Sequence, residues 1–145
     1  MTLEQAVQIG TLISVAIAAI GLIFGVIVYS RQMNAQLLLE YTKRYEEIMS
    51  SLPSNARTAR FDLFKEPPAP SEEITTVILR YLNMSSEEFY LQRKKYLSKP
   101  IWSIWEDELV RTLQSPLVKR EWDILKVEFK SYPEFYEYVE QVQNS

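Results

Sequence analysis

Four clusters of acidic residues are the side chains in this sequence that could do chemistry: Glu46–Glu47, Glu72–Glu73, Glu87–Glu88 and Glu106–Glu108. Paired carboxylates can act as general acid and base when burial separates their pKa values, and they can also hold Mg²⁺ or Ca²⁺. Adjacent residues of a helix, however, point about 100° apart. Helix starts and solvated helix faces account for most of these clusters. We therefore predict no catalytic residue, no metal site and no cofactor, and we expect that the protein is not an enzyme.

The composition removes several other kinds of site. The chain has no cysteine and no histidine. Zinc sites built on those residues, Ser-His and Cys-His nucleophile pairs, and histidine acid/base chemistry are therefore excluded. Its three glycines are Gly10, Gly21 and Gly25, all near the N-terminus. A glycine-rich phosphate-binding loop in the rest of the chain is excluded as well.

The charge distribution argues against nucleic acid as a partner. All 16 Lys and Arg residues lie at or after Arg31, together with 18 of the 19 acidic residues. That part of the chain is therefore close to neutral. It has no excess of positive charge with which to bind phosphates, so we predict no nucleic-acid partner.

The stretch that dominates the sequence is IGTLISVAIAAIGLIFGVIVYSRQ, residues 9–32. Residues 5–30 carry no charge, and the apolar run over residues 9–29 would be about 30 Å long as a helix, which is the thickness of the hydrocarbon core of a bilayer. We predict a transmembrane anchor over residues 1–30. A cleaved signal peptide is a weaker alternative because MTLEQ contains no basic residue. A soluble core helix is the weakest, because such a helix is rarely apolar all round.

Flanking charges predict the orientation of the span. Arg31, Lys43 and Arg44 follow it, and no basic side chain precedes it. The positive-inside rule then places the N-terminus outside and the C-terminal domain in the cytoplasm. We expect a single-pass protein of the inner (plasma) membrane.

Small residues form a stripe along the predicted span. On a helical wheel they fall within an arc of about 80°; they are Gly10, Ser14, Ala18, Gly21 and Gly25. Such a face allows another helix backbone to approach closely. Small residues are also common in membrane helices generally, so the stripe predicts helix packing without demonstrating it.

The remainder, residues 31–145, is predicted to be a helical domain. A juxtamembrane helix over residues 31–50 continues the span, with a stripe of Leu38, Tyr41, Tyr45, Ile48 and Leu52 that we expect to pack on the protein's own helices. Residues 51–71 read as a linker with a helical turn near residues 57–64. Residues 72–142 read as helices, one over 72–97 and others beginning at Ser98, Ser115 and Pro133. A second start at residues 85–88 is the alternative for the first of these. The fold class is therefore all-α, a single transmembrane helix continuing into a cytoplasmic helical bundle.

Two further features have a structural and a functional interpretation. Trp102 and Trp105 share a helix face, and we favour core packing over their alternative role as docking anchors for a partner. The basic runs at residues 93–95 and 119–120 could contact anionic lipid headgroups, but a solvated helix face is the favoured interpretation.

The order of features resembles a family of small bacterial membrane-anchored helical proteins classed as a domain of unknown function. The resemblance lies in RQMNAQLLLEYTKRYEEIM after the span, then IWSIWEDEL, SPLVKREWDILKVEF and PEFYEYVE. It implies an anchored helical architecture and a bacterial inner membrane. It implies no catalytic residue.

Together these features predict a membrane-anchored protein-interaction module, an accessory or regulatory subunit of a larger membrane complex. Its partners would be the lipid bilayer and other membrane subunits, or further copies of itself through the span. The alternative is a self-assembling effector that acts on the bilayer. A carboxylate-based enzyme is the least favoured of the three.

Overall fold

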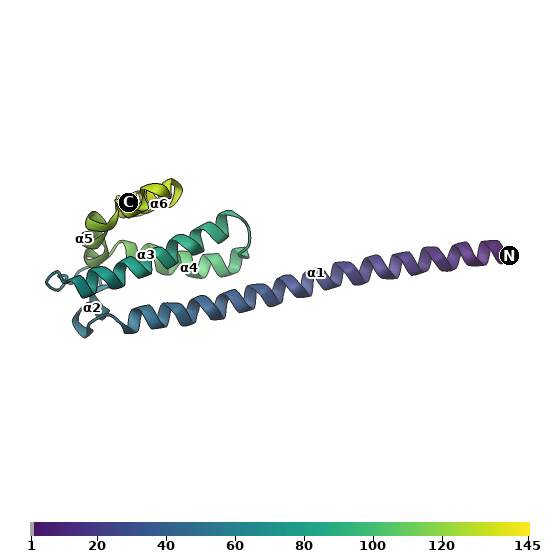
Figure 1. Cartoon of the computed structure of the whole chain (residues 1–145), viewed down its shortest axis with the longest axis horizontal. Coiled ribbons are helices and arrows are strands. Elements are labelled where there is room, and N and C mark those ends of the chain that lie inside the picture. Colours follow the sequence, from purple (N-terminus) through teal and green to yellow (C-terminus); the bar gives the residue numbers. More distant parts are fainter. Residues whose placement is uncertain (1) are drawn as a thin grey trace. The chain divides into compact units, whose positions relative to one another are not determined.

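The computed structural model describes residues 2–145, and the described part of the chain contains helices and no strand. The all-α prediction is confirmed. Figure 1 shows the helices in chain order. They are α1 (Leu3–Ser50), α2 (Ser54–Ala59), α3 (Glu72–Arg93), α4 (Lys99–Leu113), α5 (Pro116–Leu125), the 3-10 helix η1 (Glu128–Ser131) and α6 (Pro133–Gln143).

Helix α1 belongs to two compact units. The first unit ends at Leu37, and the second comprises Leu38–Ser145. No glycine or proline follows Gly25 until Pro53, so nothing in the sequence breaks the helix earlier. The two units are described separately.

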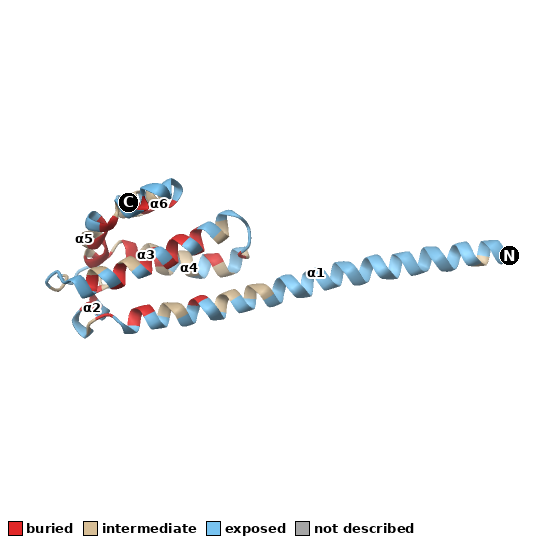
Figure 2. Cartoon of the chain, viewed as in Figure 1, coloured by how far each residue is buried: buried red, intermediate tan, exposed pale blue. Residues whose placement is uncertain are grey.

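The part of α1 in the first unit is apolar and exposed. Its most apolar 18-residue window has a mean hydropathy of 2.7, and none of that window is buried. Figure 2 shows this part of α1 as almost entirely exposed, with a few intermediate residues and no buried one, and the buried residues of α1 lie only towards its C-terminal end. A core helix of a soluble protein would be mostly buried. By length and composition this helix could span a membrane, as predicted.

The second unit has its own hydrophobic core. Helix α3 contacts α4 and α5, while α6 contacts α4 and η1. Its largest fully buried side chains include Trp122, Tyr81 and Phe129. Three residues of the predicted stripe, Tyr41, Ile48 and Leu52, are buried as well, as expected.

Serine caps fix where two of these helices begin. The Ser71 hydroxyl accepts a hydrogen bond from the Ile74 amide at 3.3 Å, and Ser115 accepts one from Val118 at 3.3 Å. Each bond satisfies a backbone donor that the first turn of a helix leaves free. The helix starts predicted at residues 72, 98, 115 and 133 are within one residue of those observed, Glu72, Lys99, Pro116 and Pro133.

The predicted end of the third helix at residue 97 was wrong, and so was the alternative of a break at residues 85–88. Helix α3 is continuous and ends at Arg93. Lys95 has a φ of 61°, and the amides of Lys95 and Tyr96 donate to the carbonyls of Gln92 and Leu91. These two bonds and the left-handed residue form a Schellman motif, which terminates a helix. Tyr96 lies beyond the end of α3 and is 57% exposed.

Two other boundaries also differ from the predictions. The helical turn expected near residues 57–64 is α2, which begins at Ser54 and ends at Ala59. The helix that begins after Ser115 ends at Leu125, and the buried Phe129 belongs to the separate 3-10 helix η1. Pro133 disfavours helical backbone at Tyr132, which has φ −120° and ψ 66°, so the chain turns there before α6.

Candidate functional site

Glu87 and Glu88, adjacent on α3, line two different cavities of the second unit. This divergence follows from the 100° that separates neighbouring residues of a helix. The first cavity is polar and broad. The second is smaller and is walled by aromatic rings and two carboxyl groups.

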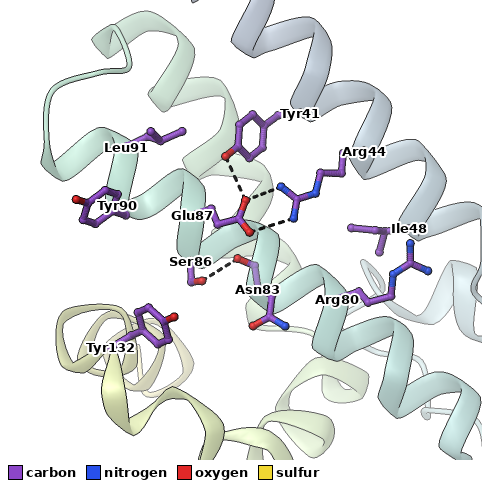
Figure 3. Close-up of a pocket in the computed structure, with 10 residues that line it drawn as sticks. All are labelled: Tyr41, Arg44, Ile48, Arg80, Asn83, Ser86, Glu87, Tyr90, Leu91 and Tyr132. Atoms are coloured by element: carbon purple, nitrogen blue, oxygen red, sulfur yellow. Dashed lines mark hydrogen bonds and ion pairs between the residues drawn. The ribbon is translucent and has the colours of Figure 1, made fainter.

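The broad cavity, of about 830 Å³, lies beside the C-terminal part of α1 and the middle of α3. Figure 3 shows Tyr41 and Arg44 of α1 reaching towards Glu87, with Tyr132 on the other side of the cavity. Arg44 donates to both carboxylate oxygens of Glu87, at 2.5 and 3.0 Å, and the Tyr41 hydroxyl donates at 3.4 Å. The full lining is Tyr41, Arg44, Ile48, Arg80, Asn83, Ser86, Glu87, Tyr90, Leu91 and Tyr132.

The Arg44–Glu87 pair joins α1 to α3. Hydrogen bonding from Arg44 lowers the pKa of Glu87, and the same bond raises the pKa of Arg44. The side chains are 40% and 47% exposed, so solvent screens the attraction and its contribution to stability is of the order of 1 kcal/mol or less. The pair is best understood as orienting α1 on α3. Its cation and its anion are already matched to each other, so this cavity offers no unbalanced charge at Glu87.

The second cavity, of about 210 Å³, lies between α1, α3 and α4. We call it the Glu88 cavity. Two of its three aromatic residues, Tyr41 and Trp105, have ring centroids 5.3 Å apart at an interplanar angle of 46°. The full lining is Leu38, Tyr41, Thr42, Tyr45, Met84, Glu88, Ile104, Trp105 and Glu108.

Glu108, on α4, is held by a network of donors. The hydroxyls of Tyr45 and Thr112 donate to one carboxylate oxygen at 2.8 Å each, and the Tyr81 hydroxyl donates to the other at 3.2 Å. Arg60 forms an ion pair with Glu108 at 3.6 Å and also donates to the Tyr45 hydroxyl. The charge of Glu108 is therefore compensated within the protein.

Glu88 is in the opposite situation. It is 6% exposed, and no hydrogen bond or ion pair connects its carboxyl group to another residue within 2–145. Burial, and next the nearby Glu108 carboxylate, raise the pKa of Glu88 to about 8. At neutral pH the group therefore holds a proton most of the time. It can release that proton when a positive charge enters the cavity.

The predicted membrane stripe lies along an exposed face of α1. Gly10, Ser14, Ala18, Gly21 and Gly25 are all exposed, and a Cβ added at any of the three glycines would meet no atom within 4 Å. The Ser14 hydroxyl donates to the Gly10 carbonyl at 2.9 Å, so it is satisfied within the helix. Helix packing through this face stays a prediction.

The two tryptophans are in different environments. Trp102 is 7% exposed and packs edge-on against Phe89, with ring centroids 6.2 Å apart. Trp105 is half-buried and stands against Tyr41 in the wall of the Glu88 cavity. Trp105 therefore has more surface than Trp102 that a ligand or partner could touch, although Trp102 also lines a cavity near the end of α3.

The charges used to predict orientation are also in different environments. Arg31 is exposed. Lys43 lies 3.9 Å from Glu47, a loose pair with both side chains mostly exposed, and Arg44 pairs with Glu87. The positive-inside rule counts basic residues whether or not acids are nearby, so these pairs leave the predicted orientation unchanged.

Sequence reasoning missed the meeting of Glu88 with Glu108, two members of different acidic clusters. One signal was available. Glu88 is four residues after Met84 and seven after Tyr81, so it continues the buried face of α3 rather than the exposed one. Nothing local indicated that Glu108 would face the same cavity. Among the residues that the structure describes, no three His, Cys, Asp or Glu side chains form a group that could hold a metal ion.

Comparison of the chain with protein-family models, with curated proteins and with solved structures found no match.

Proposed function

We propose that the chain is a single-pass membrane protein in which residues 9–29 cross the bilayer and residues 38–145 form a cytoplasmic interaction module. In this role it is an accessory or regulatory subunit of a membrane complex. The observation that carries the proposal is the apolar, wholly exposed helix in front of a unit with its own core. An exposed apolar helix of that length needs an apolar environment in place of water, and a lipid bilayer supplies one.

The continuity of α1 supports a retained anchor rather than a cleaved signal. The helix continues from the apolar segment to Ser50, where Tyr41, Ile48 and Met49 are part of the core of the second unit. A signal peptide has a short apolar region ahead of a cleavage site, whereas α1 continues as a helix into the folded domain.

Exposed apolar side chains support the interaction role. The segment after α2 exposes Phe61, Leu63 and Phe64, with Phe64 96% exposed. Clustered exposed apolar residues mark sites where proteins bind other proteins or membranes. We assign this segment to contact with another subunit of the complex.

The absence of cysteine allows a clean test of topology. Thr2→Cys and Ser145→Cys each introduce a single thiol, one at either end of the chain. In intact cells a membrane-impermeant maleimide should label the Thr2→Cys variant, and the Ser145→Cys variant only after the membrane is opened. Full-length protein found in the supernatant after membranes are pelleted would overturn the proposal.

The interaction role needs a separate measurement. The tagged full chain, extracted from native membranes in mild detergent, should co-purify with a defined partner, and Phe64→Ser should weaken that association. Ile124→Ser is a matched control, because Ile124 is 55% exposed and belongs to α5 rather than to this segment. Equal recovery of the partner with both variants would remove the assignment to residues 61–64.

A further inference from the structure

The Glu88 cavity combines two features that protein sites for organic cations share. One is a wall of aromatic rings, here Tyr41 and Trp105. The face of such a ring carries partial negative charge and attracts a cation placed within about 6 Å of its centroid. The other is a buried carboxyl group that lacks a counter-ion.

Glu88 supplies that carboxyl group. It lines the cavity, is 6% exposed, and has no partner among the residues that the structure describes, whereas Glu108 beside it has three hydroxyl donors and Arg60. A buried charge without a partner is costly, and removing that cost requires either protonation or a cation. Arg60 does not serve as the counter-ion of Glu88, because it already pairs with Glu108 and lies over the Tyr45 ring, 5.4 Å from the ring centroid.

The volume and the ligand set select the kind of cation. A cavity of about 210 Å³ is below the roughly 300 to 1,000 Å³ of sites for drug-sized molecules. Ca²⁺ takes six to eight oxygen ligands and Mg²⁺ needs near-octahedral oxygen coordination. The lining offers two carboxyl groups and the hydroxyls of Tyr41, Thr42 and Tyr45, and the rest of it is apolar. The Tyr41 and Tyr45 hydroxyls already donate to Glu87 and Glu108, so the cavity does not supply a ready shell of oxygen ligands for either ion. Aromatic walls favour a cation that is itself weakly hydrated, such as a methylated ammonium group.

We propose that the Glu88 cavity binds a small methylated ammonium group, with the Glu88 carboxylate as its counter-ion and the Tyr41 and Trp105 rings as its walls. The group can belong to a free cation such as choline or to the headgroup of a choline lipid. The proposal does not depend on the function proposed above, since all of its groups lie within residues 38–145.

Binding is coupled to proton release from Glu88. Because burial raises the pKa of Glu88 to about 8, the free cavity holds a proton at neutral pH, and the cation displaces it. Affinity should therefore rise with pH through that pKa. Arg44 opposes the rise in the pKa of Glu88. The charged or titratable groups that face Glu88 or its neighbours are Tyr41, Arg44 and Tyr45 of α1, Arg60 after α2, Tyr81 and Glu87 of α3, and Glu108 of α4.

The test uses the full chain in a maltoside detergent, which has no ammonium group. Calorimetric titration with choline is compared with titration using 3,3-dimethyl-1-butanol, which has the same shape without the charge. We expect choline to bind at least tenfold more tightly. We also expect its affinity to rise about tenfold or more between about pH 6.5 and pH 8.5. Equal binding of the two compounds, or no binding of choline at either pH, would overturn the proposal.

Variants locate the site. Glu88→Gln removes the charge and keeps the shape, so it should lower choline affinity about tenfold or more and abolish the pH dependence. Asp107→Asn, at an exposed position of α4, is the matched control and should change neither. Trp105→Leu removes one wall and should weaken choline more than the neutral compound. Unchanged choline binding in either Glu88→Gln or Trp105→Leu would contradict the assignment.

A last comparison separates the two sources of the group. The full chain is placed in nanodiscs of phosphatidylcholine and, in parallel, of phosphatidylglycerol. If the lipid headgroup is the ligand, it competes for the cavity, so free choline should bind more weakly in phosphatidylcholine nanodiscs than in phosphatidylglycerol nanodiscs. Equal affinity in both nanodiscs would support the free cation.

Discussion

The Tyr45 hydroxyl of α1 donates a hydrogen bond to the Glu108 carboxylate of α4 at 2.8 Å, across 63 residues of sequence. Burial raises the pKa of Tyr45 to about 12, so the hydroxyl keeps its proton and remains a donor at any physiological pH. The same hydroxyl accepts from Arg60, which makes Tyr45 the centre of a chain from cation to anion. This contact joins the C-terminal part of α1 to the core of the second unit.

Removing that hydroxyl should destabilise the second unit. Tyr45→Phe leaves the ring in place but leaves Glu108 and Arg60 each without one partner, which should lower the free energy of unfolding by about 1 to 3 kcal/mol. Tyr90→Phe is the control, because Tyr90 is 57% exposed. It should change stability by less than about 0.5 kcal/mol. Chemical denaturation of both variants measures the difference, and equal stabilities would show that the Tyr45 bond contributes nothing net.

Glu88 should make the protein less stable as pH rises. Its pKa is about 8 in the folded protein against an ordinary 4.5, so the folded state binds more protons than the unfolded state between those values. The stabilising contribution of the protonated form is complete below about pH 4.5 and is lost as pH rises through about 8, at a cost on the order of a few kcal/mol. The lowered pKa of Glu87 acts in the opposite direction, but only near and below 4.5.

Denaturation series at about pH 5, 6.5 and 8 measure this dependence. In Glu88→Gln the decline across that range should disappear, and the variant should be more stable than the native chain at pH 8. A native chain whose stability is constant across the range would show that Glu88 titrates normally.

Lys95 occupies a backbone position that favours glycine. Its φ of 61° costs a residue with a side chain roughly 1 kcal/mol, a cost that glycine does not carry. Lys95→Gly should therefore raise the free energy of unfolding by about 0.5 to 1 kcal/mol. Lys94→Gly is the matched control, because Lys94 has a φ of −82°, where glycine only adds freedom to the unfolded chain. That variant should be neutral or less stable, and the reverse order of the two variants would contradict the Schellman assignment.

The two tryptophans should respond differently to truncation. Trp102→Ala empties a buried position against Phe89, and the cost should be about 3 to 5 kcal/mol. Trp105→Ala opens a half-buried position at the wall of a cavity, so it should cost clearly less. Thermal denaturation of both variants measures this, and equal losses would mean that Trp105 is as much a part of the core as Trp102.

Local chemistry made most of the helix boundaries predictable. Serine caps and the prolines at helix starts act within four residues, so Ser71, Ser115 and Pro133 marked true beginnings. The end of α3 was not predictable, because a lysine rather than a glycine adopts the left-handed conformation there. The Glu88 cavity was missed for a different reason. It forms when three helices bring Tyr41, Glu88 and Glu108 together, and no local pattern encodes that contact.

The small-residue face of α1 offers the sharpest test of association in the membrane. Added side chains at Gly21 and Gly25 would meet nothing within the chain, so Gly21→Ile and Gly25→Ile should leave the fold of the single chain intact. If the face packs on another helix, the larger side chains must separate the two backbones and lose their close contact. We expect the double variant to lose a co-purifying subunit or a self-associated species in mild detergent.

Ala16→Ile with Ala19→Ile is the matched control, because these small residues lie on the opposite side of the helical wheel. Complexes that survive the glycine substitutions as well as the alanine ones would show that this stripe is not a packing face. In that case association would proceed through another face of the span, the exposed segment at Phe61–Phe64 or another surface of residues 38–145.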